Sequence, residues 1–309
     1  MLKRIIKCHI FYAMAISLII SHASAKTNNK TRRIPIPHQT SLVVDVKTGK
    51  VLHEKNSKIR IYPASLTKLM TLYLAFEAVE SGKLSMNQKL RVSRNAEKMR
   101  PLKLGLREGE YITTRDAILG TTIRSANDAS VVLAETIARS ESNFARLMTA
   151  KARKLGMKDT KFKNASGWHD PEQKTTARDL AKLAIAIKRD FPKFYPLFSQ
   201  TSFIFRGNMV NGHNRVTANY DGAEGLKTGY TTPAGYNLIT TASRNNKTLV
   251  GVVTGGSTWS ARDKAMVKLL DKHFAQHNQI NPSIKSKKYS KLASNTYIKN
   301  KKKNRFPVL

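Results

Sequence analysis

The first clear pattern along the chain is a pair of short segments rich in apolar, β-branched residues and separated by a turn, which predicts a β-hairpin. Ser41–Val46 is the first predicted strand and Val51–Glu54 the returning one. Lys47–Lys50 lies between them and has the composition of a turn. Three further strands are predicted late in the chain, at Gly225–Thr231, Tyr236–Ala242 and Thr248–Thr254. The turns that separate these three strands are short, which implies antiparallel pairing.

Between the two groups of strands, the apolar residues follow helical spacing. Ser65–Glu80 is apolar on almost every side, as expected of a helix buried in the middle of a domain. Residues 83–160 are predicted to be mostly helical. Further helices are predicted at Thr114–Ile123, Asn127–Arg139, Asn143–Leu155, Thr176–Lys188 and from Ser260 onward. The last of these helices carries one apolar stripe, formed by Met266, Leu269, Leu270 and Phe274.

The order of these elements predicts the fold class. Strands lie at both ends of the domain and helices lie between them, so we expect an α+β fold. In this fold an antiparallel β-sheet is flanked by helices and carries an all-helical subdomain. The predicted domain spans residues 40–278. Residues 26–39 are polar and contain prolines, which is typical of a loose N-terminal arm.

Residues 1–25 have the organisation of a secretory signal peptide. Three basic residues precede an apolar run from Ile10 to Ile20, and the small residues Ala23-Ser24-Ala25 follow as a cleavage site. The run is about half the roughly 20 residues that a membrane-spanning helix needs. We therefore expect export to the periplasm or the exterior of the cell envelope. Cys8, the single cysteine, lies within this signal, so a mature chain would have no disulfide, thiolate metal site or thiol nucleophile.

The chain is strongly basic, with a formal net charge of +35. The signal contributes +3, which leaves +32 for residues 26–309. Such a charge favours an anionic partner. No aromatic-basic RNA-binding signature or zinc-finger spacing is present, so an anionic cell envelope is expected rather than nucleic acid. Residues 279–309 hold nine Lys or Arg and no Asp or Glu, and they are predicted to form a disordered tail that tethers the protein to the envelope. A solvated basic surface without a partner is the alternative.

Ser65 and Lys68 form the first candidate for chemistry. Their spacing of three residues places both side chains on one face of a helix, with Cβ atoms about 5–6 Å apart. A serine hydroxyl becomes a nucleophile when a base takes its proton, and a lysine serves as that base when burial or a nearby cation lowers its pKa. The positive end of the helix dipole near Ser65 favours a developing oxyanion. Alternatively, Ser65 is a helix cap and Lys68 a surface residue.

Two more short motifs follow at positions where side chains can meet a substrate. Ser125 and Asn127 lie in a tight turn between two predicted helices, where a hydroxyl could relay a proton and an amide could hold a carbonyl. Lys227-Thr228-Gly229 lies on a predicted strand, where a lysine can bind a carboxylate and a glycine allows close approach. Each motif has chance matches elsewhere, including Lys47-Thr-Gly49 in the hairpin turn, so the order of the three motifs is the informative feature.

This order is similar to that of the penicillin-recognising serine acyltransferases. Residues 40–278 resemble the low-molecular-mass penicillin-binding proteins that are D-alanyl-D-alanine carboxypeptidases, peptidase family S11. The resemblance implies the transpeptidase fold that penicillin-binding proteins share with β-lactamases. The stretches that carry it are Tyr62–Met70, Ser125–Ala129, Asn164–Gly167, Thr176–Ala181, Gly225–Thr231 and Ala234–Asn237.

The resemblance also implies catalytic roles. Ser65 would form the acyl-enzyme, and Lys68 would be the general base. Ser125 would pass a proton to the leaving D-alanine, and Asn127 would orient Lys68 and the substrate amide. No metal or other cofactor is implied. The expected substrates are peptidoglycan stem pentapeptides, and the expected inhibitors are β-lactam antibiotics.

The same resemblance assigns residues to substrate binding. Lys227 and Thr228 would hold the terminal carboxylate, and Arg262 would contribute to the same contact. The backbone N–H groups of Ser65 and Tyr230 would form the oxyanion hole. Many relatives have histidine at the position of Tyr230, but the hole uses backbone, so we expect catalysis to survive. Many relatives also carry a β-rich second domain and an amphipathic C-terminal helix, and residues 279–309 match neither.

Several alternatives share some of these features. A D,D-endopeptidase that cuts peptide cross-links has the same motifs. A β-lactamase needs a carboxylate that activates water, and the 162–176 stretch offers only Asp170 and Glu172 without that family's sequence context. A non-catalytic, basic wall-binding protein would not need the serine and lysine motifs. Zinc-dependent cleavage is not indicated, because no H-E-x-x-H occurs and the histidines, such as His213, are scattered and expected to be structural.

Overall fold

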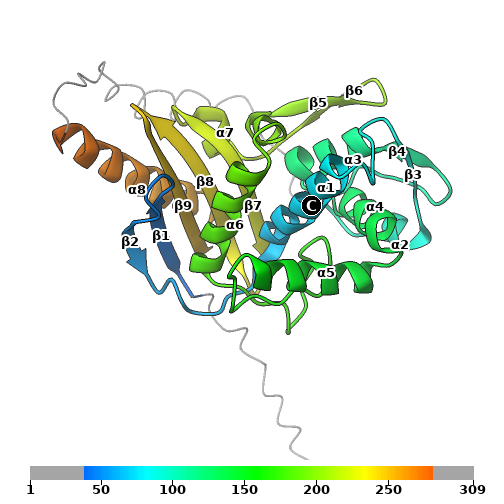
Figure 1. Ribbon diagram of the computed structural model, residues 1–309, viewed down its shortest axis with the longest axis horizontal. Helices are drawn as coiled ribbons and strands as arrows, with labels where there is room; N and C mark the ends of the chain where they lie inside the picture. The colour runs from blue at the N-terminus through cyan, green and yellow to red at the C-terminus, as the bar shows by residue number, and fades with distance from the viewer. Residues whose placement is uncertain (1–37, 281–309) are drawn as a thin grey trace, which may run out of the picture. The chain divides into compact units, whose positions relative to one another are not determined.

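The computed structural model describes residues 38–280 (Figure 1). The predicted signal peptide, almost all of the N-terminal arm and almost all of the basic tail lie outside these described residues. Within residues 38–280, no helix combines the length and apolar character needed to cross a membrane.

The sheet has five antiparallel strands in the order β2-β1-β9-β8-β7. Their bounds are β1 Thr40–Asp45, β2 Val51–Lys55, β7 Ala223–Thr231, β8 Gly235–Arg244 and β9 Lys247–Gly256. The central pairing joins β1 to β9, with Val43 opposite Gly251, so the two ends of the domain share one sheet. This arrangement confirms the five predicted strands and their antiparallel pairing. β7 is an edge strand, paired only with β8 in the sheet.

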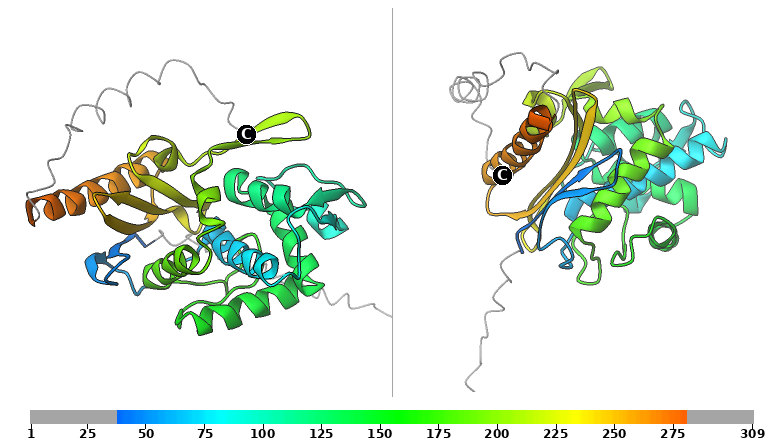
Figure 2. Two further views of the ribbon diagram at one scale, coloured as in Figure 1. Left: turned by 45° about the horizontal axis from the view of Figure 1, so that its top comes forward. Right: turned by 60° about the vertical axis from the view of Figure 1, so that its left-hand side comes forward.

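The two faces of the sheet are covered by different helices, which follows from the alternation of side chains along each strand. Val43 packs with Met266, Leu270 and Phe274 of α8 (Trp259–Ile280) on one face. Leu42 belongs to the larger core on the other face, where α6 (Ala177–Asp190) crosses β1, β8 and β9. Figure 2 shows α8 on one side of the sheet and α6 on the opposite side. Val216 of the short helix α7 (Arg215–Asn219) packs with the α8 residues, so α7 lies on the α8 side.

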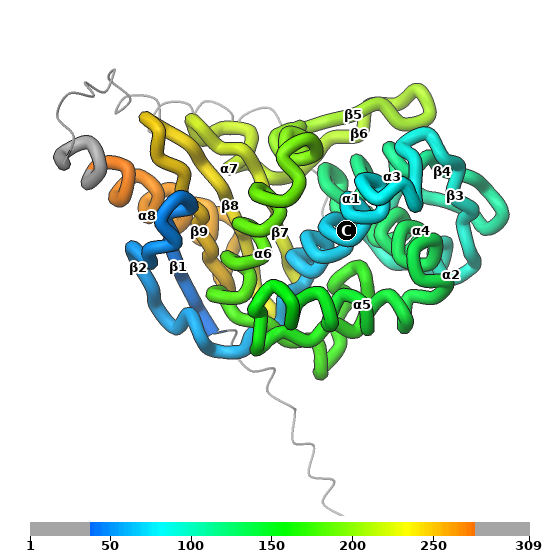
Figure 3. Tube along the Cα trace, viewed as in Figure 1, coloured from blue at the N-terminus to red at the C-terminus, as the bar shows by residue number. Residues whose placement is uncertain are grey.

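The helix α1 (Lys68–Glu80) connects the sheet side of the domain with the helical side (Figure 3). Ten of its 13 residues are buried, as the sequence predicts. It contacts α4, α5 and α6, and the 3-10 turn η1 (Ala64–Thr67) leads into it and lies against β7 and β8. The other helices on this side are α2 Arg94–Glu97, α3 Thr114–Leu119, η2 Gly120–Arg124, α4 Asn127–Ala138 and α5 Glu141–Lys154. The predicted α+β fold with a helical subdomain is therefore confirmed.

Several short elements differ from the sequence prediction. The 83–160 segment, expected to be mostly helical, also contains a two-stranded sheet of β3 (Lys89–Arg91) and β4 (Tyr111–Thr113). Three-residue strands are too short for a period of two to be recognised. A second hairpin and two short helical turns were likewise not predicted, and these are β5 Ser202–Phe205, β6 Asn208–Asn211, η3 Tyr195–Ser199 and α7 Arg215–Asn219.

Candidate active site

Ser65 lies in the η1 turn, one turn earlier than α1 itself begins. The residue before it, Ala64, has a φ of 48°, in the left-handed region that non-glycine residues rarely adopt. Gly167 packs directly against this turn, because a methyl group at Gly167 would lie 1.9 Å from the carbonyl oxygen of Ala64. The conformation of the turn is therefore held by tertiary contacts, which is common at functional sites.

Lys68 is completely buried, and its amine is held by three oxygen atoms. Lys68 Nζ lies 3.0 Å from Ser65 Oγ and 2.6 Å from Asn127 Oδ1, and it also donates to the carbonyl oxygen of Ser166. Loss of solvent and, second, the positive charge of Lys227 hold the pKa of Lys68 well below its usual value. The arrangement places an amine that readily loses its proton within reach of a serine hydroxyl.

The second motif is anchored at the start of α4. Ser125 has a φ of 62° and ends the π-helical turn η2, and its buried hydroxyl has no hydrogen-bond partner among the described residues. Asn127 donates from Nδ2 to the carbonyl oxygens of Arg100 (3.1 Å) and Pro101 (3.3 Å). Its amide orientation is therefore fixed, and Oδ1 faces Lys68. The structure thus joins the Ser65 motif to the Ser125 motif through one short hydrogen bond.

The third motif lies on the edge strand β7 beside the η1 turn. A methyl group at Gly229 would lie 3.0 Å from the backbone nitrogen of Ser65, so glycine permits the strand to approach the turn. Lys227 is buried, and its amine donates to the carbonyl oxygen of Thr228 at 3.2 Å. Burial and, second, the nearby Arg262 lower the pKa of Lys227 to about 7.

Arg262 and Tyr230, two further residues predicted for the site, differ in how far their side chains are exposed to solvent. Arg262 is buried and bound to Asp263 Oδ1 at 2.7 Å and to the carbonyl oxygen of Asn237 at 3.3 Å, so its guanidinium is fixed near β8. The side chain of Tyr230 is exposed, and its ring packs against Tyr236 with centroids 4.3 Å apart. The positive charge of Arg262 lowers the pKa of Lys227, so the guanidinium of Arg262 lies close to the third motif.

Sequence reasoning missed one residue of this region, His213. His213 Nε2 lies 2.9 Å from Thr228 Oγ1, within the third motif. Burial and the surrounding cations, first Lys227 and then Arg124, lower the pKa of His213 to about 3, so the ring is neutral at physiological pH. The contact joins a loop to a strand 15 positions further along the chain, and no spacing rule in the sequence points to it.

Loops outside the three motifs support the same turn. Asn164 Oδ1 accepts the N–H of Gly167 at 2.8 Å, which shapes the loop that supplies the Ser166 carbonyl to Lys68. Asn237 donates to the carbonyl of Tyr62 at 3.1 Å and accepts the N–H of Gly255 at 2.9 Å. These contacts explain physically why asparagine and glycine occur at these positions of the motif-bearing stretches.

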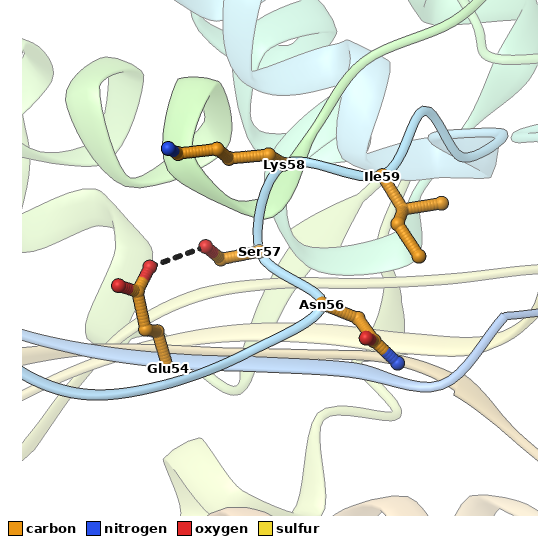
Figure 4. Close-up of a pocket in the computed structure, with 5 residues that line it drawn as sticks. All are labelled: Glu54, Asn56, Ser57, Lys58 and Ile59. Atoms are coloured by element: carbon orange, nitrogen blue, oxygen red, sulfur yellow. Dashed lines mark hydrogen bonds between the residues drawn. The ribbon is translucent and has the colours of Figure 1, made fainter.

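A separate depression lies at the end of β2, and the serine in it has a different hydrogen-bond partner from Ser65 (Figure 4). Glu54, Asn56, Ser57, Lys58 and Ile59 line it. The hydroxyl of Ser57 donates to Glu54 at 2.6 Å, so this serine faces a carboxylate and not a buried lysine amine. The serine–lysine chemistry therefore belongs to the Ser65 site.

Comparisons with known proteins agree with this geometry. The sequence profile of the family described as D-alanyl-D-alanine carboxypeptidase, peptidase S11, matches residues 25–258. D-alanyl-D-alanine carboxypeptidase DacF of Bacillus subtilis is 34% identical over 281 residues, which cover 89% of this chain and 72% of the relative. Penicillin-binding protein 5 of Haemophilus influenzae has 33% identity and a TM-score of 0.74, over 78% of this chain and 71% of that one.

A structure with a bound antibiotic is also similar. Penicillin-binding protein D2 of Listeria monocytogenes in its ampicillin-bound form has 30% identity and a TM-score of 0.70, covering 76% of this chain and 96% of that chain. The predicted transpeptidase fold of the penicillin-binding proteins is thus confirmed. Because the family profile matches residues 25–258, which make up most of the chain, the chain belongs to the D-alanyl-D-alanine carboxypeptidases of peptidase family S11.

Proposed function

We propose that this enzyme removes the terminal D-alanine from peptidoglycan stem pentapeptides through an acyl-enzyme on Ser65. The observation that carries the assignment of residues is the position of Lys68. Its buried amine lies 3.0 Å from Ser65 Oγ, and burial and the nearby Lys227 hold the pKa of this amine well below its usual value. Titratable groups whose pKa is strongly shifted are concentrated at functional sites, which supports this assignment.

Acylation follows from this pair. Neutral Lys68 takes the proton of Ser65 as Oγ attacks the carbonyl carbon between the two D-alanines. The backbone N–H groups of Ser65 and Tyr230 stabilise the oxyanion. Ser125, whose hydroxyl has no other partner among the described residues, delivers a proton to the nitrogen of the departing D-alanine. Asn127 keeps the Lys68 amine oriented during these transfers.

The terminal carboxylate is bound on the other side of the scissile bond. Lys227 and Thr228 are the direct contacts, and the guanidinium of Arg262 adds positive charge nearby. His213 holds the hydroxyl of Thr228 through a hydrogen bond of 2.9 Å. A neutral ring that donates from Nε2 leaves the Thr228 hydroxyl free to donate to the carboxylate. Water then hydrolyses the acyl-enzyme, and the chemistry uses no metal or other cofactor.

β-Lactam antibiotics would react at the same serine. Attack of Ser65 Oγ on the lactam carbonyl breaks the C–N bond of the ring, and the opened drug stays attached because its amine cannot diffuse away. Peptidoglycan lies outside the cytoplasmic membrane, so the proposed reaction takes place in the periplasm or at the exterior of the envelope. Attraction between the basic chain and the anionic envelope would keep the enzyme near its substrate.

Mass spectrometry of the purified protein tests the assignment of the nucleophile. Incubation with penicillin should add the mass of the drug to one peptide that contains Ser65, and Ser65→Ala should abolish the label. Ser57→Ala is the matched control, because Ser57 is a buried serine in the other depression, and this variant should label like the wild type. A label that persists in Ser65→Ala would disprove the assignment.

A pair of peptides separates the carboxypeptidase from an endopeptidase. The wild type should hydrolyse a pentapeptide ending in free D-Ala-D-Ala, and amidation of the C-terminus should slow the reaction at least tenfold, because a charged contact to Lys227 is lost. Lys227→Ala should remove most of this preference. Equal rates for free and amidated peptides would instead favour an endopeptidase that cuts cross-links.

A further inference from the structure

The three most exposed large apolar side chains of the described structure lie on two small hairpins. Met209 is 65% exposed, and Ile204 and Tyr111 are each 59% exposed. Ile204 and Met209 are direct partners in the pairing of β5 with β6, so their side chains share one face of that hairpin. Tyr111 begins β4 in the hairpin of β3 and β4. Exposed apolar side chains that gather in one region mark a site of interaction.

An ion pair joins the two hairpins. Arg206, in the turn between β5 and β6, lies 2.8 Å from the carboxylate of Glu110, which directly precedes Tyr111. Figure 1 shows both hairpins at the end of the molecule opposite α8. The exposed apolar side chains of the two hairpins therefore belong to one region of the surface.

The hairpin of β3 and β4 has a buried face and an exposed face. Leu90 and Ile112, which are partners across the two strands, are buried. On the other face Arg91 lies directly opposite Tyr111, and Lys89 is two residues away along the same strand. Both basic side chains are exposed. The name hairpin surface is used below for the outward residues Lys89, Arg91, Tyr111, Ile204 and Met209.

The segment that forms the first hairpin is strongly basic. Residues 89–113 contain seven Lys or Arg and three Glu. All seven cations are exposed, and none of them belongs to an ion pair within residues 38–280. Of the three acids, Glu110 is neutralised by Arg206. The hairpin surface therefore combines an excess of positive charge with exposed apolar side chains.

An anionic lipid bilayer is complementary to both of these features. Apolar side chains on a projecting hairpin can enter between lipid headgroups, while Lys and Arg remain with the lipid phosphates. Tyrosine is enriched at the membrane–water interface, where its ring is apolar and its hydroxyl is hydrated. A hydrophilic anionic polymer would attract the cations but would leave Ile204 and Met209 in water.

We propose that the hairpin surface docks the enzyme on an anionic phospholipid bilayer. Ile204 and Met209 enter the boundary between headgroups and acyl chains, Tyr111 lies at the headgroups, and Lys89 and Arg91 bind lipid phosphates. This inference is carried by the folded domain alone, so it depends neither on the proposed function nor on the basic tail.

Fluorescence from a single labelled position tests contact with the bilayer. Cys8 is the only cysteine, so in a Cys8→Ser chain Met209→Cys can be the one residue that carries an environment-sensitive dye. Vesicles of equal parts phosphatidylglycerol and phosphatidylcholine should shift the emission of this dye to the blue, because the dye leaves water. Leu147→Cys is the matched control, since Leu147 is 45% exposed on α5 outside the hairpin surface, and its dye should keep the aqueous emission.

Co-sedimentation with the same vesicles measures the contribution of the apolar side chains. Ile204→Ser combined with Met209→Ser should lower the partition coefficient about tenfold, because two apolar contacts with the bilayer are lost. The loss should be similar at low and high salt, since salt screens charges and not apolar contacts. Both side chains are exposed, so the double variant should unfold at the wild-type temperature.

The same assay measures the contribution of the cations. Lys89→Gln combined with Arg91→Gln should lower the partition coefficient about tenfold at low salt, and the effect should shrink at high salt. Lys154→Gln combined with Lys158→Gln is the matched control, because it removes the same charge from two exposed residues outside the hairpin surface. This control should change the partition coefficient by less than about threefold.

The outcomes separate the bilayer from other partners. A dye on Met209→Cys that keeps its aqueous emission while the chain sediments with vesicles would assign lipid binding to another segment and overturn the proposal. Equal partitioning of the Ile204→Ser, Met209→Ser chain and the wild type would overturn it too, as would a wild type that binds no vesicles. If the double variant instead loses binding to lipid-free peptidoglycan and keeps its binding to vesicles, the hairpin surface binds the wall polymer and the membrane assignment is wrong.

Discussion

Two buried lysines of the site differ in how well their amines are bound, and this difference determines what each contributes to stability. Lys68 has three oxygen partners, whereas Lys227 has one hydrogen bond, to the carbonyl oxygen of Thr228. An ammonium group buried with one partner and near the positive charge of Arg262 is unfavourable. Its retention is explained by the carboxylate it would bind.

Lys227→Met should therefore stabilise the fold while impairing catalysis. Methionine fills a similar volume without a charge, and we expect the free energy of unfolding at pH 7 to rise by about 1–2 kcal/mol. Thermal unfolding measures this change. Hydrolysis of peptides with a free carboxylate should fall at least tenfold. A variant that is less stable than the wild type would show that Lys227 is needed for folding.

The pH dependence of stability should change in the same variant. The pKa of Lys227 is about 7 in the folded protein and 10.5 when unperturbed, so between these values the unfolded chain binds more protons. The free energy of unfolding therefore rises with pH in this range, by up to about 1.4 kcal/mol per pH unit for one group. Lys227→Met should remove the contribution of this one proton and so lower the slope by up to about 1.4 kcal/mol per pH unit. Urea unfolding at several pH values measures the slope. An unchanged slope would show that Lys227 is not buried as a neutral amine.

The sequence located most of these residues through motifs, but not the contacts between them. Ser65 and Lys68 lie one helical turn apart, so their spacing alone predicts that they meet. The bond from Lys68 to Asn127 crosses 59 positions, and the pairing of Thr228 with His213 joins a loop to a strand. Such contacts depend on how elements pack, and His213 was accordingly expected to be only structural.

At the scale of elements, the η1 turn depends on the close packing of Gly167. A Cβ on Gly167 would overlap the Ala64 carbonyl, so the turn that carries Ser65 would have to move. Gly167→Ala should lower the rate of penicillin acylation about 100-fold or more. A displacement of about 1 Å in an active site is enough to reduce the rate by about this factor.

Gly156→Ala is the matched control for this change. Gly156 has a φ of 75°, similar to the 83° of Gly167, but nothing lies within 4 Å of the position of a Cβ there. Both variants should lose about 1 kcal/mol of stability from backbone strain. Only Gly167→Ala should lose acylation, measured as the rate of penicillin labelling. Equal loss in both variants would assign the effect to strain and not to the displaced turn.

Elements with a long, repeated pattern were predictable, and short ones were not. The strands β8 and β9 and the helices α4 and α6 each present several turns or alternations to the core. The π-helical turn Gly120–Arg124, which ends with Ser125 in a left-handed conformation, has no such pattern. Its geometry is set by the neighbouring α3 and α4, so only the structure reveals how Ser125 is oriented.

At the scale of the whole molecule, the predicted tail concentrates the positive charge. Residues 279–309 carry nine cations and no anions, and almost all of them lie outside the described structure. Each Lys or Arg near an anionic surface contributes about 1 kcal/mol at low screening. Truncation after Asn278 should therefore reduce binding to isolated cell envelope, and salt should weaken binding of the full chain.

The same truncation should leave hydrolysis of a soluble pentapeptide unchanged, because the tail follows the segment that carries the site. Co-sedimentation with envelope at low and high salt measures the first effect, and a peptide assay measures the second. Equal binding of the truncated and full-length proteins at every salt concentration would assign the attraction to the folded domain instead.

The turn that carries Ser65 continues directly into α1, and this connection limits which substitutions can persist during evolution. The helix that begins with Lys68 is the most buried helix of the described structure, so a substitution there that lowers reactivity toward a drug also disturbs folding. Trp168 and His169 are exposed and adjoin the same turn, and substitutions there cost little stability. Selection by antibiotics would therefore find more viable variants along this exposed rim than in the helix, and lineages under such selection should diverge at the rim first.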